Sequence, residues 1–425
     1  MKVKYIKARE ILDSRGVPTI STILQLEDGT TAKGEVPSGA STGKTEVLEL
    51  RDEDLKRYRG KGVLSAVDNV NNLISQQLVG KEFESQKQFD KFLIDMDGTE
   101  LKSNFGGNSI LSLSMAFCRA TAISKRIPLY RYFSQLYNEN ETQQSKISLP
   151  EAMILVMEGG EHGNWATDIQ EYMIVPRRTK FPSFSEALRA GAEVFHAIHD
   201  ILVQKNYSAT VGLEGAFAPI QIQSNLEAFD IILEGIESAG YTPNDEIYIA
   251  IDVAASEFYD PTQRKYALKR ENKLLDSSEW VDLQKDWYEK YPIQSIEDPM
   301  DQEDWEGWQN IMGRIGQEKQ IIGDDLLTTN TKRIDKAVGM GAVNSVLVKL
   351  NQIGSITETI GAIKLSQKSG FSSVISHRSG ETNDDMIADL VVGTAAQQCK
   401  FGGPDRGERI AKYNRLLEIE NLLSG

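Results

Sequence analysis

The stretch "IQSIED" (residues 293–298) is a short apolar run that ends in carboxylates. Further runs of this form are "IYIAID" (247–252), "QIIGDD" (320–325), "SVLVK" (345–349) and "SSVISHR" (372–378). These runs alternate with helical segments, and alternating strands and helices are typical of a parallel sheet. The number of such units in the last 280 or so residues predicts a closed (β/α) barrel.

Each of these five runs has an ionisable residue at its end, namely Asp252, Glu297, Asp324, Lys349 and His377. From Glu297 onward the gaps are 27, 25 and 28 residues, close to one βα unit each. A barrel gathers the carboxyl ends of its strands at one face, where active sites lie. A single polar residue at a strand end more often only faces water, but five ionisable ones predict a shared site.

The types of these residues indicate the chemistry of the site. Three carboxylates without Cys or His ligands favour Mg²⁺ or Mn²⁺ over zinc, and they need a cation to stay ionised together. Lys349 beside that cation would lose its proton more easily and would then be a general base. Arg378 and Ser379 offer a guanidinium fork and a hydroxyl suited to a phosphate. This pattern predicts proton abstraction next to a metal-bound carboxylate.

A series of longer motifs makes the chain resemble the enolase family. They are "AREILDSRG", "VPSGASTGKTEVLELRD", "DIQEYMIVP", "TVGLEGAFAP", "IDVAASEFY", "SIEDP", "IGDDL", "VKLNQIGSITET", "SHRSGET" and "DLVVGT", in family order from residue 8 to about residue 415. The resemblance implies a (β/α)8-type enolase barrel, of class α/β, with an N-terminal α+β domain. It also implies the Mg²⁺-dependent, reversible dehydration of 2-phospho-D-glycerate to phosphoenolpyruvate, a step of glycolysis and gluconeogenesis.

The resemblance further implies roles for single residues. Asp252, Glu297 and Asp324 would bind the first Mg²⁺, Lys349 would remove the C2 proton, and Glu214 would be the acid that helps the C3 hydroxyl leave. The remaining roles are support of the acid by Glu171, closure of a loop with His162 over the substrate, and substrate binding by Gln170, His377, Arg378, Ser379 and Lys400.

The stretch "EVPSGASTGKTE" (residues 35–46) looks like a phosphate-binding P-loop, but its glycines enclose three residues instead of four. A P-loop also follows a buried apolar strand, whereas here Pro37 stands two residues before the first glycine, Gly39. A flexible surface loop is the plain alternative. The resemblance implies a mobile lid in which Ser41 binds a second Mg²⁺ that arrives with the substrate.

The N-terminal part begins with strand patterns in "YIKAREILD" and "TISTILQLEDGTTAKGEV", with Asp28-Gly29 as a hairpin turn. Helical patterns follow. "SAVDNVNNLISQQLVG" places Val67, Val70, Leu73, Ile74 and Leu78 on one face, and "NSILSLSMAFCRATAISKRIPLY" is strongly apolar. We expect an N-terminal α+β domain over residues 1–137, a linker over 138–146 and the catalytic barrel over 147–425.

The net charge of −15 argues against nucleic acid as a partner, because such proteins need a basic face. No apolar run reaches the length of a membrane span, and the N-terminus has no signal-peptide pattern. Two isolated cysteines fit a reducing cytoplasm. The resemblance leaves cell-surface or secreted display open, and it implies a homo-oligomer, a dimer or an octamer.

The sequence departs from the family pattern near the acid and at the expected subunit contact. Leu213 replaces the usual Asp, Ala216 the second Gly, and Glu158 an Asn; Ser21 and Glu418 replace an intersubunit ion pair. Two alternatives therefore stay open beside an active enolase. One is a low-activity paralogue that acts mainly as a binding protein, and the other is an enolase-superfamily enzyme for a related phosphorylated acid.

Overall fold

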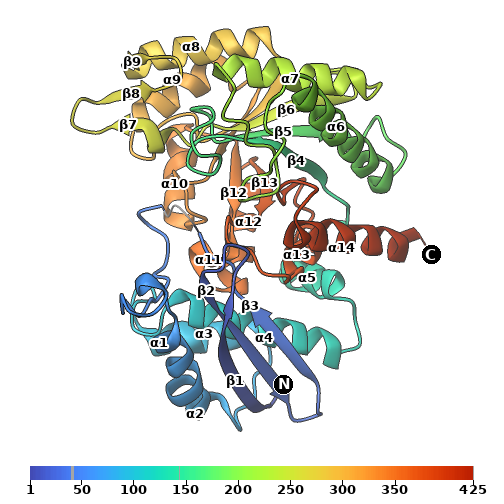
Figure 1. The fold of residues 1–425 in the computed structure, drawn as a ribbon. Coiled ribbons are helices and arrows are strands. Elements are labelled where there is room, and N and C mark those ends of the chain that lie inside the picture. The colour runs from blue at the N-terminus through green and yellow to red at the C-terminus, as the bar shows by residue number, and fades with distance from the viewer. Residues whose placement is uncertain (40–42, 143, 425) are drawn as a thin grey trace.

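The structure is a computed structural model that describes residues 1–39, 43–142 and 144–424. Figure 1 shows two parts, with the chain's first third below and the barrel above it. The lower part starts with an antiparallel sheet in the order β1 (Val3–Leu12), β2 (Pro18–Leu26) and β3 (Thr31–Glu35). Asp28 and Gly29 form the turn between β2 and β3, as the sequence predicts.

Helices follow this small sheet and complete the N-terminal part. They are α1 (Leu64–Asp68), η2 (Asn69–Ile74), α2 (Ser75–Leu78), α3 (Gln86–Asp97), α4 (Gly107–Ser124) and α5 (Leu129–Asn138), with the single turn η1 (Tyr58–Gly60) before them. Of these helices, α4 packs on β2 and β3. The predicted apolar face of residues 64–78 is wrong at Leu73, which is 51% exposed. At about 100° per residue Leu73 lies at the edge of the face formed by Val70, Ile74 and Leu78, and it falls within η2, which is a π-helix.

The second part is the predicted closed barrel, built from eight of the described strands. Around the barrel they are β10 (Ile293–Glu297), β11 (Gln320–Gly323), β12 (Ser345–Val348), β13 (Ser372–Ser376), β14 (Gln398–Lys400), β4 (Glu151–Glu158), β5 (Glu171–Pro176) and β6 (Ile247–Asp252). These strands are short and almost wholly buried, as expected for strands covered on both faces.

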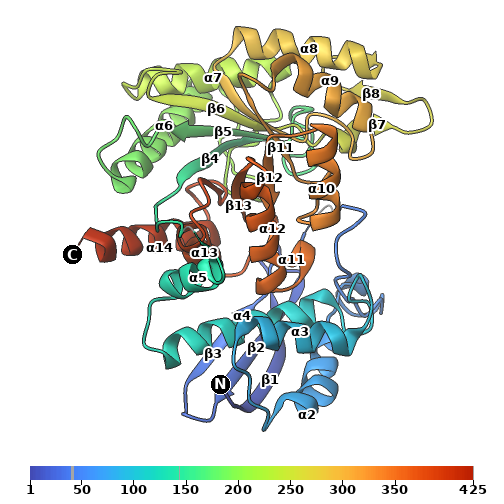
Figure 2. The ribbon, with the colours of Figure 1, turned by 180° about the vertical axis from the view of Figure 1, so that it is seen from behind.

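Helices surround the barrel in Figures 1 and 2. They are α6 (Phe184–Gln204), α7 (Asn225–Ser238), α8 (Ser277–Lys290), α9 (Trp305–Ile315), α10 (Thr331–Met340), α11 (Leu350–Ile353), α12 (Ile356–Lys368), α13 (Met386–Gly393) and α14 (Gly407–Ser424). A small hairpin sheet of β7 (Tyr259–Asp260), β8 (Lys265–Leu268) and β9 (Lys273–Leu275) follows η3 (Ala255–Phe258).

One strand departs from the expected parallel sheet. β5 runs antiparallel to both β4 and β6, whereas the other neighbours in the barrel are parallel. The physical reason is that β4 and β5 are joined by a loop over 159–170 without a crossover helix, and two helices, α6 and α7, follow β5 instead. The first residue of β5 therefore lies at the end of the barrel where the other strands finish.

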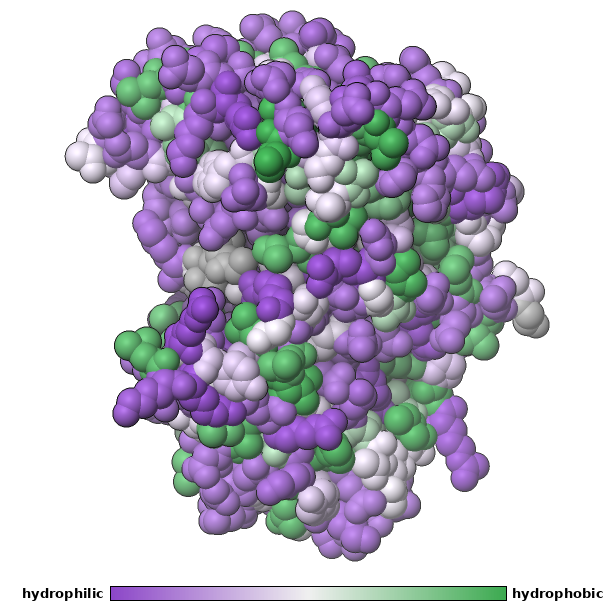
Figure 3. Space-filling model, in the orientation of Figure 1, coloured by the Kyte–Doolittle hydropathy of each residue, from purple (hydrophilic) through white to green (hydrophobic). Residues whose placement is uncertain are grey.

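The interior of the barrel is apolar, whereas the face of the molecule drawn in Figure 3 carries mostly hydrophilic residues. Apolar side chains fill the barrel, among them Met153, Met173, Tyr248, Leu347 and Val374. On the face drawn in Figure 3, hydrophobic residues are scattered among hydrophilic ones. Among the helices of the described residues, none is both long and apolar enough to cross a membrane.

Candidate active site

Four carboxylate residues are direct neighbours along the rim of the barrel. Glu158 at the end of β4 pairs in register with Glu171 at the start of β5, and Glu171 pairs in turn with Asp252 on β6. Asp252 then pairs with Glu297 on β10. This row exists because β5 is reversed, so that its first residue joins the last residues of its neighbours.

Lys400 lies at the centre of this row. Its Nζ is 2.8 Å from Glu297 Oε2, 3.0 Å from Asp252 Oδ2 and 3.1 Å from Glu171 Oε2. Burial alone would lower the pKa of Lys400, but the three carboxylates hold it well above its usual value. Lys400 therefore stays a cation and holds together the side chains of β5, β6 and β10.

Lys349, which directly follows β12, forms an ion pair with Oδ2 of Asp324. Gln352 Nε2 donates to the other carboxylate oxygen of Asp324 at 2.9 Å. Burial lowers the pKa of Lys349, but the Asp324 carboxylate outweighs it and raises the pKa above the ordinary value. This differs from the predicted loss of the proton. Lys349 can become a base only once another cation shares the charge of Asp324.

Glu214 lies between two histidines. His162 Nδ1 is 3.4 Å from Glu214 Oε1, and His377 Nε2 is 3.2 Å from Glu214 Oε2. Arg409 donates to Nδ1 of His377 at 2.7 Å. Since Arg is only a donor and burial lowers the pKa of His377 to about 3, the neutral ring carries its proton on Nε2, toward Glu214. Burial works against an ionised Glu214, but the histidines and Arg409 hold its pKa well below the ordinary range.

Arg378 and Ser379, predicted phosphate contacts, follow His377 directly and are buried. Arg378 donates to Glu46 at 2.9 Å and to Asn351 Oδ1 at 3.1 Å. Ser379 Oγ lies 3.1 Å from His162 Nε2. Arg378 and Ser379 are thus tied to Glu46 of the N-terminal part and to the β4–β5 loop.

The structure brings nearly all the predicted site residues around one small cavity of about 20 Å³. Those that line it are His162, Gln170, Glu171, Glu214, Asp252, Asp324, Lys349, His377, Arg378, Ser379 and Lys400. Glu297 is buried, pairs with Lys400 and is absent from the lining of the cavity, and Ser41 lies outside the described residues. Gln170 has a buried Oε1 without a hydrogen-bond partner among the described residues, so the side chain can still accept one bond.

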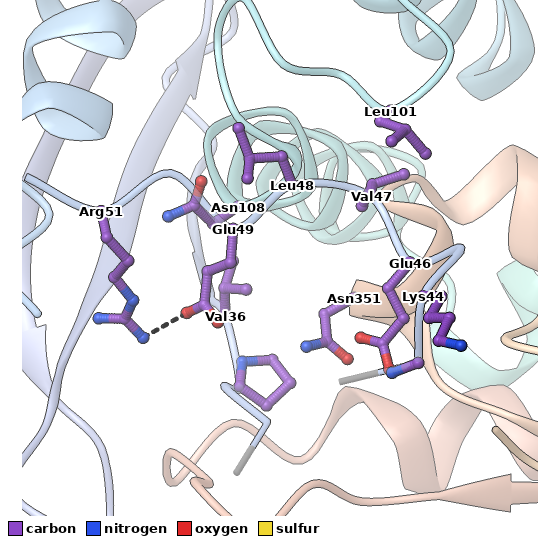
Figure 4. A pocket seen from close by; sticks show the side chains of 12 residues that line it. Val36, Lys44, Glu46, Val47, Leu48, Glu49, Arg51, Leu101, Asn108 and Asn351 are labelled. Carbon is purple, nitrogen blue, oxygen red and sulfur yellow. Dashed lines mark hydrogen bonds and ion pairs between the residues drawn. The ribbon is translucent and has the colours of Figure 1, made fainter. Parts of the chain in front are cut away.

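A larger pocket of about 470 Å³ adjoins this cavity and is shown in Figure 4. Glu46 and Asn351, the partners of Arg378, both line it, and Arg51 pairs there with Glu49. The inner cavity has room for about one water molecule. The Glu46 carboxylate therefore occupies Arg378 on the side of the larger pocket.

Comparison with known families agrees with this geometry. The model of the enolase N-terminal domain matches residues 3–133, and that of the enolase C-terminal TIM barrel domain matches residues 146–425. The chain belongs to the enolase family. Its fold is that of the family, a barrel preceded by an N-terminal domain, and membership supports a hydro-lyase of the enolase type.

An enolase-type Mg²⁺ fits the donor set of this chain. The predicted ligands Asp252, Glu297 and Asp324 offer only hard carboxylate oxygens, and Glu297 Oε1 is buried without a hydrogen-bond partner among the described residues. Lys400 now takes part of the charge of two of them. The described groups whose ligand atoms already lie within 4.8 Å of one another are different ones, Asp298 with Asp324 and Asp325, and His162 with Glu171 and Glu214. His377 also faces the latter group, with Nε2 3.2 Å from Glu214 Oε2.

Sequence reasoning missed several residues that shape this enolase-type site. Asp298 is buried and accepts the backbone N–H groups of Asp324 at 2.9 Å and Asp325 at 2.7 Å, which fixes the loop after β11. Arg409 on α14 is fully buried and donates to the carbonyl oxygens of Arg378 and Ser379 at 2.6 and 2.7 Å. The doubled acids of "SIEDP" and "IGDDL" were a signal for Asp298. Nothing in the spacing of Arg409 indicated its place.

Proposed function

We propose that the protein catalyses the reversible dehydration of 2-phospho-D-glycerate to phosphoenolpyruvate with Mg²⁺. The observation that carries this proposal is that one cavity is lined by a lysine base, an acid between two histidines, and an arginine–serine pair suited to phosphate. A cavity with this combination suits a substrate that has an acidic C–H, a leaving hydroxyl and a phosphate.

The proposed proton transfers divide between the two ends of the cavity. Nζ of Lys349 takes the proton from C2, and the electron pair of that C–H bond becomes the C2–C3 double bond. The C3–O bond breaks, and Glu214 gives a proton to the leaving hydroxyl, which departs as water. Because its pKa is low at rest, Glu214 must first take up that proton. In the reverse direction Glu214, as a carboxylate, takes a proton from water, and Lys349 returns one to C2.

The other residues bind and orient the substrate in this proposal. Arg378 and Ser379 bind the phosphate, and Lys400 faces the substrate carboxylate together with Gln170. Asp252, Glu297 and Asp324 would hold the first Mg²⁺, and Ser41 would take part in binding the second. When bound, these ions supply the positive charge that balances the substrate carboxylate as C2 loses its proton. His162 Nδ1 lies 3.4 Å from Glu214 Oε1 and 3.7 Å from Glu171 Oε1, so His162 would position Glu214, and Glu171 would act through His162.

The decisive test is the absorbance of the enol product when purified protein meets 2-phosphoglycerate, with Mg²⁺ and with a chelator. We expect metal-dependent turnover that is lost in Lys349→Ala. Lys285→Ala is the matched control, because Lys285 lies on the surface of α8, where it pairs with Glu289. Absence of turnover from folded, Mg²⁺-binding protein would refute the proposal and would favour one of the two alternatives, a related phosphorylated acid or a protein partner.

A further inference from the structure

Glu158, the last residue of β4, is a carboxyl group for which the proposed reaction has no direct use. It is fully buried. Within the described residues, no Lys, Arg or His nitrogen lies within 4 Å of its carboxyl oxygens. A buried carboxylate without a paired cation is strongly unfavourable, so this group favours its neutral form.

The contacts of Glu158 are with the turn that carries Glu214. Its Oε1 accepts the backbone N–H of Glu214 at 3.0 Å and that of Ala216 at 2.9 Å. A Cβ at Gly212 would lie 2.4 Å from Oε2 of Glu158, so only glycine lets the turn approach this closely. Both ends of the turn therefore rest on one carboxyl group.

The second oxygen of Glu158 behaves differently from the first. Oε2 is buried and has no hydrogen-bond partner among the described residues. Burial, followed by the negative charge of Glu214, raises the pKa of Glu158 to about 8. At neutral pH one oxygen thus accepts two hydrogen bonds, and the other carries a proton.

We propose that Glu158 is a positioning residue for Glu214, which fixes the turn over 212–216 and, by its own charge, sets how readily Glu214 takes up a proton. This inference rests on the proposed function, in which Glu214 must hold a proton for dehydration. When Glu158 ionises, its negative charge opposes ionisation of Glu214 and favours the protonated acid. The other charged or titratable groups that face the pair are His162, Glu171, His377 and Arg409.

The test compares the wild type with Glu158→Gln over a range of pH. The glutamine amide oxygen can accept both N–H groups, and its NH₂ takes the place of the protonated oxygen, so kcat at pH 7 should stay within a few-fold. Above pH 8 the side chain at position 158 becomes negatively charged in the wild type, whereas the glutamine of the variant stays neutral. The ratio of the dehydration kcat of the wild type to that of Glu158→Gln should therefore rise roughly tenfold between pH 7 and pH 9.

Two further variants separate positioning from charge. Glu158→Ala leaves the N–H groups of Glu214 and Ala216 without their acceptor, and we expect kcat to fall roughly a hundredfold at every pH. Glu151→Gln is the matched control, because Glu151 begins the same strand and binds Tyr248 and the backbone N–H of Arg178. The ratio of the dehydration kcat of the wild type to that of Glu151→Gln should not change with pH.

A second readout does not depend on turnover. The infrared carbonyl band of a protonated carboxylic acid should be present in the difference between wild type and Glu158→Gln at pH 7 and should disappear at pH 9. A kcat ratio that is flat with pH, or no such band, would overturn the proposal. If the wild type does not turn over 2-phosphoglycerate, the proposed function fails, and the infrared band still decides where the proton lies.

Discussion

Replacing Glu46 by Gln should make the protein bind phosphate more tightly. The Glu46 side chain is 7% exposed and accepts from both terminal nitrogens of Arg378 at 2.9 and 3.4 Å. A substrate phosphate must break this charged pair before it can use Arg378. A hydrogen bond between charged groups contributes about 1.5–3 kcal/mol and a neutral one about 0.5–1.5. Removing the charge should therefore favour phosphate by about 1.5 kcal/mol, or about tenfold.

The assay is isothermal titration with inorganic phosphate, which needs no turnover. The Kd of Glu46→Gln should be about tenfold lower than that of the wild type. Glu49→Gln is the control, because Glu49 lines the same pocket but pairs with Arg51. In an Arg378→Ala background the substitution should have no effect. A Kd that is unchanged or higher in Glu46→Gln would refute the reasoning, because Glu46 would then not compete with phosphate for Arg378.

Three other predictions concern stability, the acid and assembly. Burial raises the pKa of Asp90 from 3.8 to about 6, so the folded state binds this proton more tightly than the unfolded state. Stability should fall by up to about 3 kcal/mol as pH rises from about 4 to about 6, and Asp90→Asn should remove that fall in urea titrations. Leu213→Asp should raise kcat by placing a like charge beside Glu214, and an unchanged or lower kcat would count against this idea. Light scattering should show a homo-oligomer although Ser21 is buried against Glu35 of its own chain, and a monomer would contradict it.

The barrel and its rim could be predicted from the sequence because buried strands leave a simple signal. The runs that end at Asp252, Glu297, Lys349 and His377 are apolar enough to be buried on both faces, and each is followed by a helix or loop. Closure of the barrel then brings their ends together, whatever the sequence between them. The existence of the site therefore followed from spacing, and the roles of its residues rest on the family resemblance.

The direction of β5 could not be predicted in this way. Its sequence, "EYMIVP", has no feature that distinguishes an antiparallel strand from a parallel one, since it is buried on both faces like its neighbours. Glu171 begins this strand instead of ending it, so a search for ionisable strand ends passes over it. Glu46 lies outside the strands, and its importance comes from a contact with Arg378, 332 residues away. Glu158 does end an apolar strand, but that position does not reveal its contact with the turn 56 residues away.

The balance of charges at the rim explains why a divalent cation suits this enolase-type site. The buried carboxyl groups there are Glu158, Glu171, Glu214, Asp252, Glu297, Asp298 and Asp324. The cations that contact them are few: Lys400 binds three, Lys349 binds one, and Arg409 acts on Glu214 through His377. Burial raises the pKa of Glu171, Glu297 and Asp298 well above the ordinary value, so additional positive charge at the rim favours their ionised forms. Binding of Mg²⁺ should therefore release protons, and its affinity should weaken as the pH falls.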